Sequence, residues 1–129
     1  MANGATLAGH ILIEDRAVIG GIVAIHQFCR VGTHSFIGGV SGVTLDIPPY
    51  MLASGSHVKL FGLNTIGLKR ASFSEETLKA LKKAYRIIFR SSLTLEKAIK
   101  RVEEEEISQI PEVRHLLHFI QQSKRGIAR

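Results

Sequence analysis

The feature that most constrains the fold is a six-residue repeat in the first third of the chain. A fixed period of six matches neither the 3.6-residue helix nor the alternation of an antiparallel meander. It suits a chain wound as a triangular prism, with three short strands to a coil and aliphatic side chains stacked inside. Every sixth residue is aliphatic, from the first to the seventh member: Leu7, Ile13, Ile19, Ile25, Val31, Ile37 and Val43.

Glycines punctuate this repeat. Gly20, Gly32 and Gly38 each directly follow an aliphatic position. Glycine adopts backbone conformations that other residues reach only with strain, so we expect each hexad to be a short strand followed by a tight turn. The glycines would supply the unusual dihedral angles at the corners, and strands of successive coils would pair in parallel. Such solenoids need about three or more repeats and a capped end, so we expect further coils or partner chains.

Composition changes near residue 48. Eight of the twelve glycines precede residue 43, whereas Glu, Lys and Leu at helical spacing dominate after residue 74. We therefore expect a hexapeptide-repeat β-helix over residues 1–50, a connecting loop segment over 51–73 and a three-helix C-terminal domain over 74–129. The helices would pack as a small bundle against the prism.

Three helix starts can be located from capping residues. Ser72 and Glu75 have the spacing of a capping box before an apolar stripe, which predicts a helix over about 75–90. Thr94 can cap a second helix, and Pro111 suits the first turn of a third.

Composition and charge exclude several classes of protein. Apolar residues make up 45% and charged residues 22%, which predicts a folded chain, and no apolar run approaches the ~20 residues of a membrane span. A single cysteine, Cys29, excludes an internal disulfide and a multi-cysteine zinc site. The N-terminal residues have no basic segment leading into an apolar one, so we expect a cytoplasmic protein.

The positive charge lies in the second part of the chain. Residues 1–50 carry a net charge of −1 and residues 51–129 carry +7. A basic surface can meet nucleic acid, an anionic membrane or an acidic protein, and charge alone does not choose among them. The helices carry no recognised nucleic-acid motif and few interleaved aromatic residues, so we do not expect nucleic-acid binding.

Three histidines interrupt the repeat at positions predicted to face outward. His26 stands where other hexads have Gly, Ala or Glu, and His10 and His34 occupy the fourth place of a hexad. They are either exposed residues without a role or a line of imidazoles on one outer surface. No Cys or carboxylate lies at ligand spacing from them, so we expect no metal site.

Six segments together resemble one family of acyltransferases. The family comprises the acyl-carrier-protein-dependent UDP-N-acetylglucosamine O-acyltransferases, which begin lipid A synthesis. The resemblance covers nearly all of the chain and corresponds to about the C-terminal half of the family's usual length. It implies a left-handed parallel β-helix of about two coils and a small α-helical C-terminal domain. The segments are residues 3–10 (NGATLAGH), 19–28 (IGGIVAIHQF), 38–42 (GGVSG), 46–50 (DIPPY), 61–64 (FGLN) and 67–70 (GLKR).

The resemblance also implies roles in acyl transfer. The family's general-base histidine, which takes the proton of the sugar 3-hydroxyl group, matches a position before this chain begins. His10 matches a later histidine of the substrate site, and the amide of Gly9 matches the proposed oxyanion donor. Gly39 matches the acyl-chain ruler, where a glycine leaves the groove open to a longer hydroxyacyl chain. No cofactor is expected.

Four further positions concern the sugar nucleotide. His26 and Gln27 match residues beside the substrate, while Asn64 and Arg70 match residues that hold the nucleotide. The chain departs from the family at two more: Ile66 stands where many relatives have a carboxylate, and Ala71 where some have a second arginine. We expect uridine recognition to differ accordingly.

The family's assembly implies partners. It is a homotrimer with active sites between neighbouring prisms, and the basic helices would face the acidic acyl carrier protein. Two hypotheses follow. In the first, the chain is an acyltransferase or its essential half, and His10 or His26 replaces the missing base. In the second, it is a non-catalytic trimer that binds nucleotide sugar. Related enzymes that acylate an amine of UDP-sugars share the repeat, so the accepting group stays open.

Overall fold

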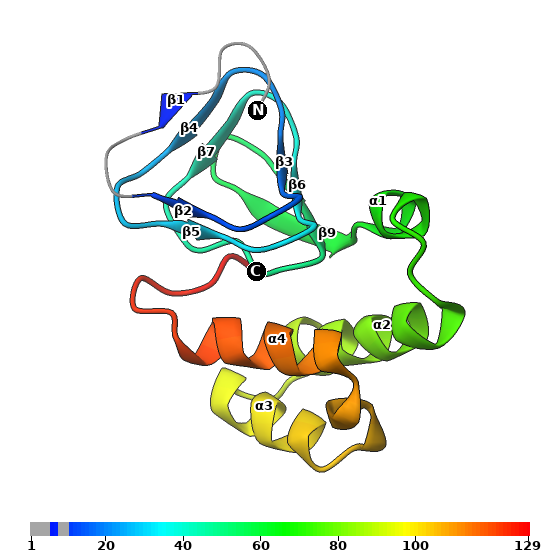
Figure 1. Cartoon of the computed structure of the whole chain (residues 1–129). Helices are drawn as coiled ribbons and strands as arrows, with labels where there is room; N and C mark the ends of the chain where they lie inside the picture. The colour runs from blue at the N-terminus through cyan, green and yellow to red at the C-terminus, as the bar shows by residue number, and fades with distance from the viewer. Residues whose placement is uncertain (1–5, 8–10) are drawn as a thin grey trace.

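The computed structural model describes residues 6–7 and 11–129 (Figure 1). Within these residues, nine short strands come first and helices follow. The strands are β1 (Thr6–Leu7), β2 (Leu12–Ile13), β3 (Val18–Ile19), β4 (Val23–Ile25), β5 (Arg30–Val31), β6 (Phe36–Ile37), β7 (Ser41–Val43), β8 (Met51–Ser54) and β9 (Lys59–Leu63). The helices are α1 (Thr65–Arg70), α2 (Glu75–Phe89), α3 (Leu95–Glu103), the short 3₁₀ helix η1 (Glu106–Gln109) and α4 (Pro111–Gln121).

Strands eighteen residues apart pair in parallel, as the repeat predicts. β1 pairs with β4 and β4 with β7, so that Leu7, Ile25 and Val43 lie in one register. β2 pairs with β5, and β3 pairs with β6. The three sets of strands lie on three sides of a triangular section (Figure 1).

The repeated aliphatic side chains fill the interior of this section. Ile19, Ile25, Val31, Ile37 and Val43 are each no more than 2% exposed. The prediction that these residues stack inside is confirmed for them. The same apolar cluster continues through the buried faces of α2, α3 and α4, which lie below the side of the triangle formed by β2 and β5 (Figure 1).

The corners of the triangle do not use glycine. Left-handed φ values recur every sixth residue at non-glycine positions: Arg16 (62°), Ile22 (54°), Phe28 (69°), His34 (55°) and Val40 (57°). The prediction that glycines supply these dihedral angles is therefore wrong, because no described glycine before residue 43 has a positive φ. Each such residue costs about 1–2 kcal/mol of backbone strain, which burial of the aliphatic interior offsets.

The glycines in this region permit close approach of the backbone instead. A Cβ atom on Gly32 would lie 2.3 Å from the backbone nitrogen of Pro49. One on Gly20 would lie 2.7 Å from the backbone nitrogen of Gly39. Both contacts are shorter than any side chain tolerates, so packing between successive turns of the chain excludes a larger residue.

Residues 51–73 were expected to be a connecting loop, and this expectation is wrong. β8 adds to the parallel β3–β6 sheet, β9 returns antiparallel to β8, and α1 follows. Burial alternates along β8, with Met51 and Ala53 inside, which is the period of a strand with one buried face. This hairpin and α1 form one wall of the pocket described below.

The three predicted helices after residue 74 are α2, α3 and α4. Thr94 caps α3 by accepting the Lys97 N–H at 3.3 Å, as predicted. The cap of α2 is Ser74, whose Oγ accepts the Thr77 N–H at 3.1 Å. The prediction that Ser72 caps this helix is wrong, because Ser72 has a φ of 65° and ends the turn after α1.

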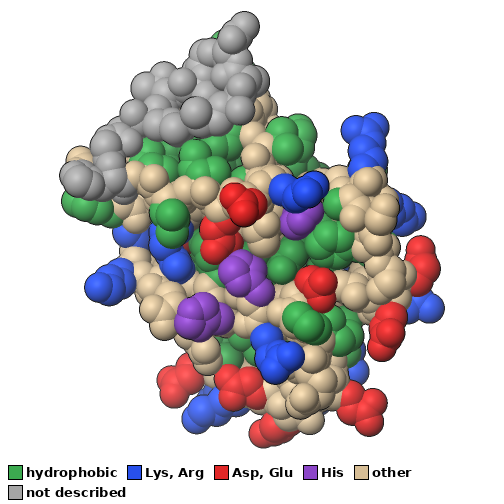
Figure 2. Space-filling view, viewed as in Figure 1, with side chains coloured by type: hydrophobic (Ala, Val, Ile, Leu, Met, Phe, Trp, Pro, Cys, Tyr) green, Lys and Arg blue, Asp and Glu red, His purple; other side chains and the backbone are tan. Residues whose placement is uncertain are grey.

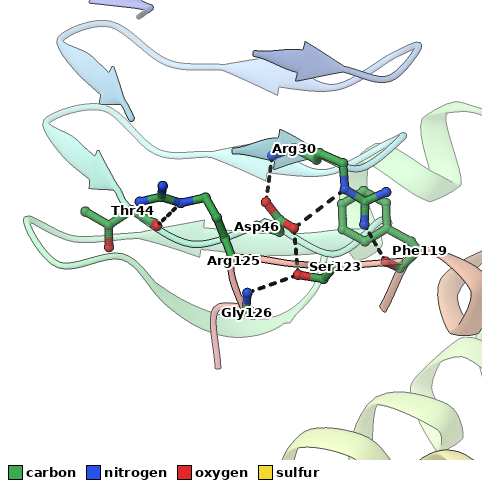
Figure 3. Close-up of polar contacts among 7 residues, drawn as sticks. All are labelled: Arg30, Thr44, Asp46, Phe119, Ser123, Arg125 and Gly126. Carbon is green, nitrogen blue, oxygen red and sulfur yellow. Dashed lines mark hydrogen bonds and ion pairs between the residues drawn. The ribbon is translucent and has the colours of Figure 1, made fainter. Parts of the chain in front are cut away.

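Asp46 connects the C-terminal segment after α4 to the strand region (Figure 3). Asp46 is 1% exposed, and its Oδ1 accepts the Arg30 backbone N–H at 2.8 Å. Its Oδ2 accepts the Ser123 hydroxyl at 2.6 Å and lies 3.6 Å from Arg30 Nε. The Arg30 guanidinium stacks on Phe119 of α4, 4.1 Å from the ring centre. This one carboxylate joins the strands, α4 and the closing segment.

None of the helices in the described ranges combines the length and apolar character needed to cross a bilayer.

Candidate functional site

A pocket of about 680 Å³ lies between the prism and α1. Two arginines and one histidine are its only ionisable lining residues, and the rest of the described lining is mostly apolar. None of the described residues that line it carries a carboxylate. The lining comprises Arg16, Val18, His34, Phe36, Leu52, Leu63, Asn64, Thr65, Ile66, Gly67, Arg70 and Ala71.

Asn64 is fixed in this pocket by its place before α1. Its Oδ1 accepts the Gly67 N–H at 3.4 Å, which caps the helix, and its Nδ2 donates to the His34 carbonyl at 3.0 Å. Its own backbone N–H donates to the Tyr50 carbonyl at 2.8 Å. A Cβ on Gly67 would lie 2.4 Å from Asn64 Nδ2, so the glycine is what lets the amide lie over the helix start. Asn64 thereby ties α1 to the His34 corner of the prism.

His34 forms the inner part of the pocket wall. Its ring meets the Phe73 ring edge-on with centres 4.9 Å apart and stacks on Tyr50 at 6.2 Å. Burial lowers the pKa of His34 below its usual 6.5, and the positive charge of Arg16 lowers it further. The imidazole is therefore mainly neutral at pH 7 and contributes a neutral donor and acceptor to the pocket.

Arg70 is the last residue of α1 and is exposed at the pocket mouth. Ile66, one turn earlier, is 69% exposed, and Ala71 follows Arg70 as the C-cap. The structure thus brings Asn64, Arg70, Ile66 and Ala71 to one pocket. Their binding roles remain predictions from the resemblance.

The remaining predicted site residues do not line this pocket. His26 is exposed, with its N–H donating to the Val43 carbonyl at 2.9 Å. Gln27 is also exposed, and its carbonyl accepts from Arg125 Nη1 at 3.3 Å. Gly39 is exposed near the Gly21 carbonyl, which an added Cβ would approach to 3.1 Å. One copy of the described chain does not unite these residues with Asn64.

Two predicted catalytic residues, Gly9 and His10, lie outside the described residues. The described part of the chain holds no group of three or more His, Cys, Asp or Glu placed to share a metal ion.

Arg16 is the pocket residue that sequence reasoning missed. It lies eighteen residues before His34, and both occupy the fourth place of a hexad. The eighteen-residue register places the two at the same corner of successive turns of the chain, and both line the pocket. This spacing was the available signal, although it does not show on its own which corner α1 covers.

Comparisons with known proteins agree on one family. A family model described as UDP N-acetylglucosamine O-acyltransferase, domain 2, matches residues 46–128. A relative from Thermodesulfovibrio yellowstonii is 59% identical over all 129 residues, and one from Anaeromyxobacter dehalogenans strain 2CP-1 is 48% identical over the same length. Both are named acyl-(acyl-carrier-protein)–UDP-N-acetylglucosamine O-acyltransferase. The match covers 50% of each, so the chain spans about half the length of these curated relatives.

Solved structures give the same similarity. The UDP-N-acetylglucosamine acyltransferase of Bacteroides fragilis superposes with a TM-score of 0.95 at 41% identity, covering 99% of this chain and 50% of that one. The Arabidopsis UDP-N-acetylglucosamine acyltransferase superposes with a TM-score of 0.92 at 38% identity, covering 98% and 47%.

Proposed function

Because the chain belongs to the UDP-N-acetylglucosamine O-acyltransferase family, we propose that it supplies about half of an enzyme that acylates UDP-N-acetylglucosamine. The reaction would transfer a 3-hydroxyacyl chain from acyl carrier protein to the glucosamine 3-hydroxyl group, the first step of lipid A synthesis. The sugar oxygen attacks the thioester carbonyl, the C–S bond breaks, and the hydroxyl proton ends on the released thiol. The observation that carries this proposal is the match of the whole chain to relatives named for that reaction.

We propose that the strands form a left-handed parallel β-helix of about two coils over residues 1–50, with a separate helical domain over 74–129. The eighteen-residue register and the three parallel sheets support the helical winding. The handedness rests on the relatives' fold.

Asn64 and Arg70 would hold the nucleotide in the pocket against α1. Support comes from the two arginines of the pocket, the lack of a carboxylate among its described lining residues, and a volume large enough for a nucleoside diphosphate. A fork of guanidinium N–H groups suits phosphate oxygens. Ile66 would leave the uridine without a carboxylate partner from α1, so apolar contact with the base takes its place.

Assembly as a homotrimer would complete the site. Several large apolar side chains on the outer faces of the prism are half or more exposed, which favours a partner surface. They are Leu12 (54%), Val18 (50%), Ile22 (67%) and Val40 (69%). A neighbouring prism would bring His26, Gln27 and the Gly39 groove of one chain toward the nucleotide pocket of the next.

The acyl donor would dock on the basic helices. Lys79, Lys82, Lys83 and Arg86 are exposed on α2, and the Lys83 amine pairs with Glu105 at 3.0 Å. Such a face suits an acidic carrier protein, and rising salt would weaken the encounter. A cytoplasmic location is part of the same proposal.

The test is acyl transfer with the 129-residue chain, 3-hydroxyacyl carrier protein and UDP-N-acetylglucosamine. Mass spectrometry would detect the acylated sugar nucleotide. Product that resists mild base would carry an amide and favour an amine acceptor, whereas a base-labile ester fits the 3-hydroxyl group. Product formation would place a competent base within the chain, and His10→Ala and His26→Ala would identify it.

A folded chain without turnover would favour the second hypothesis, a trimer that binds nucleotide sugar. Calorimetry with UDP-N-acetylglucosamine then measures binding alone. Unchanged binding by His26→Ala, with exposed His118→Ala as the matched control, would show that His26 is not at the substrate.

A further inference from the structure

Two guanidinium groups from separate elements share the pocket. Arg16 comes from the turn between β2 and β3, and Arg70 comes from the end of α1. Neither side chain forms a hydrogen bond or ion pair with another residue in the described part of the chain. Two unpaired positive charges facing one pocket raise its potential, and an anion of matching charge relieves their repulsion.

Two carboxylates directly precede Arg16 in the sequence, and neither forms an ion pair with it among the described residues. Glu14 Oε1 accepts the Thr33 N–H at 2.9 Å and lies 2.9 Å from His115 Nε2 on α4. Asp15 is exposed, and its carbonyl oxygen accepts the Thr33 hydroxyl and the His34 N–H. The local charge balance therefore leaves the Arg16 guanidinium available to a ligand.

Arg16 lies at a corner of the prism and lines the pocket. Its φ of 62° is a conformation that favours glycine and costs a bulky residue about 1–2 kcal/mol. Arg16 and His34 both line the pocket, and the charge of Arg16 adds to burial in lowering the pKa of His34. The rest of the lining is mostly apolar, with Val18, Phe36 and Leu52 among its residues.

This arrangement fits a ligand with two adjacent phosphates on an organic body. Each guanidinium can hold one phosphate through two parallel N–H donors. A monophosphate would satisfy one arginine and leave the other unpaired. We propose that Arg16 binds the second phosphate of the nucleotide diphosphate, opposite the phosphate held by Arg70. This inference rests on the proposed nucleotide site and adds a binding residue from the prism.

The test is calorimetry of the full chain with uridine, UMP and UDP. We expect the wild-type chain to bind UDP more tightly than UMP. Arg16→Gln should weaken UDP binding about 10- to 100-fold, the effect of losing one charge-assisted pair, and should bring the UDP and UMP affinities together. Arg16→Lys should recover part of the loss, since it keeps the charge without the fork.

Two controls separate the possible causes. Arg16→Gly suits the φ at this position, so it should fold at least as stably as Arg16→Gln and lose UDP affinity equally. Arg114→Gln removes an exposed arginine of α4 outside the pocket and should leave binding unchanged.

Two results would overturn different parts of the reasoning. If Arg16→Gln and Arg16→Gly both bind UDP within twofold of wild type while Arg70→Gln loses affinity, the role of Arg16 is wrong and the nucleotide site stands. If the folded wild-type chain binds no UDP, the proposed nucleotide site is itself wrong.

Discussion

Replacing Asp46 with alanine should strongly destabilise the fold, because this buried carboxylate interacts with three polar groups of two residues, Arg30 and Ser123. Asp46 is 1% exposed, accepts the Arg30 N–H at 2.8 Å and the Ser123 hydroxyl at 2.6 Å, and lies 3.6 Å from Arg30 Nε. Removing one member of a buried ion pair costs ~3–5 kcal/mol. The Arg30 side chain is 22% exposed, so water replaces part of the lost interaction and the lower end of that range applies. We expect Asp46→Ala to lower the free energy of unfolding by about 3 kcal/mol.

Asp46→Asn removes the negative charge of this side chain and keeps its size and shape. Its remaining oxygen can still accept the Arg30 N–H, but the amide group would face Arg30 Nε and Ser123 without a negative charge. We expect a loss of about 2 kcal/mol, between wild type and Asp46→Ala.

The assay is urea unfolding followed by circular dichroism, with linear extrapolation to water. Glu96→Ala is the matched control, since its side chain is 84% exposed and its oxygen lies 3.9 Å from Lys100 Nζ. That exposed pair should contribute less than about 0.5 kcal/mol. A loss below about 1 kcal/mol for Asp46→Ala would refute the reasoning that this carboxylate holds the closing segment to the strands.

Three further predictions follow from the backbone and from His34. Gly32→Ala should cost about 3 kcal/mol of unfolding free energy, because the new Cβ would lie 2.3 Å from the Pro49 nitrogen; a wild-type urea midpoint would contradict this. Ser72→Gly should leave stability unchanged or raise it by up to about 1 kcal/mol, since φ is 65° there, and Ser72→Val should lower it. The folded chain holds the pKa of His34 below its unfolded value, so the unfolded chain binds that proton more readily and stability falls as pH drops through about 6.5. His34→Asn, which tolerates the left-handed φ of 55°, should therefore reduce the stability difference between pH 7.5 and 5.5; an identical difference would show that another group is responsible.

The aliphatic interior of the strand region could be predicted from the sequence because its residues recur at a single period. Ile19, Ile25 and Ile37 must be aliphatic, since each stacks on the residue one turn of the chain away, and the period of six is visible without any structure. The helices after residue 74 were predictable for the same reason, because α2 buries a single stripe.

The left-handed residues at the corners of the triangle could not be predicted, because their side chains share no chemical property. Arg16, Ile22 and His34 share a left-handed φ but differ in chemistry, since each faces outward and only the backbone is constrained. The glycine pattern was misleading because Gly20 and Gly32 are required by close contact with the backbone of the next turn of the chain. Residues adjacent in sequence do not reveal that contact.

The site was predictable where its residues are close in sequence. Asn64 caps the start of α1 and Arg70 is its last residue, so one short segment brings both to the pocket. Arg16 reaches the same pocket from far along the chain, and nothing local to residue 16 indicates that α1 will cover that corner. His26, Gln27 and Gly39 are not among the described residues that line this pocket, and only the proposed trimer would bring them to it.

The register of the first seven strands also limits how this fold can change in length. Leu7 aligns with Ile25 and Ile25 with Val43, so an insertion or deletion of eighteen residues among these strands returns every strand to an equivalent partner. A change of six or twelve residues would move each strand onto another side of the triangle, and one that is not a multiple of six would turn aliphatic side chains out of the interior. Homologous chains should therefore differ in this region by whole turns of eighteen residues, with irregular insertions confined to the corners.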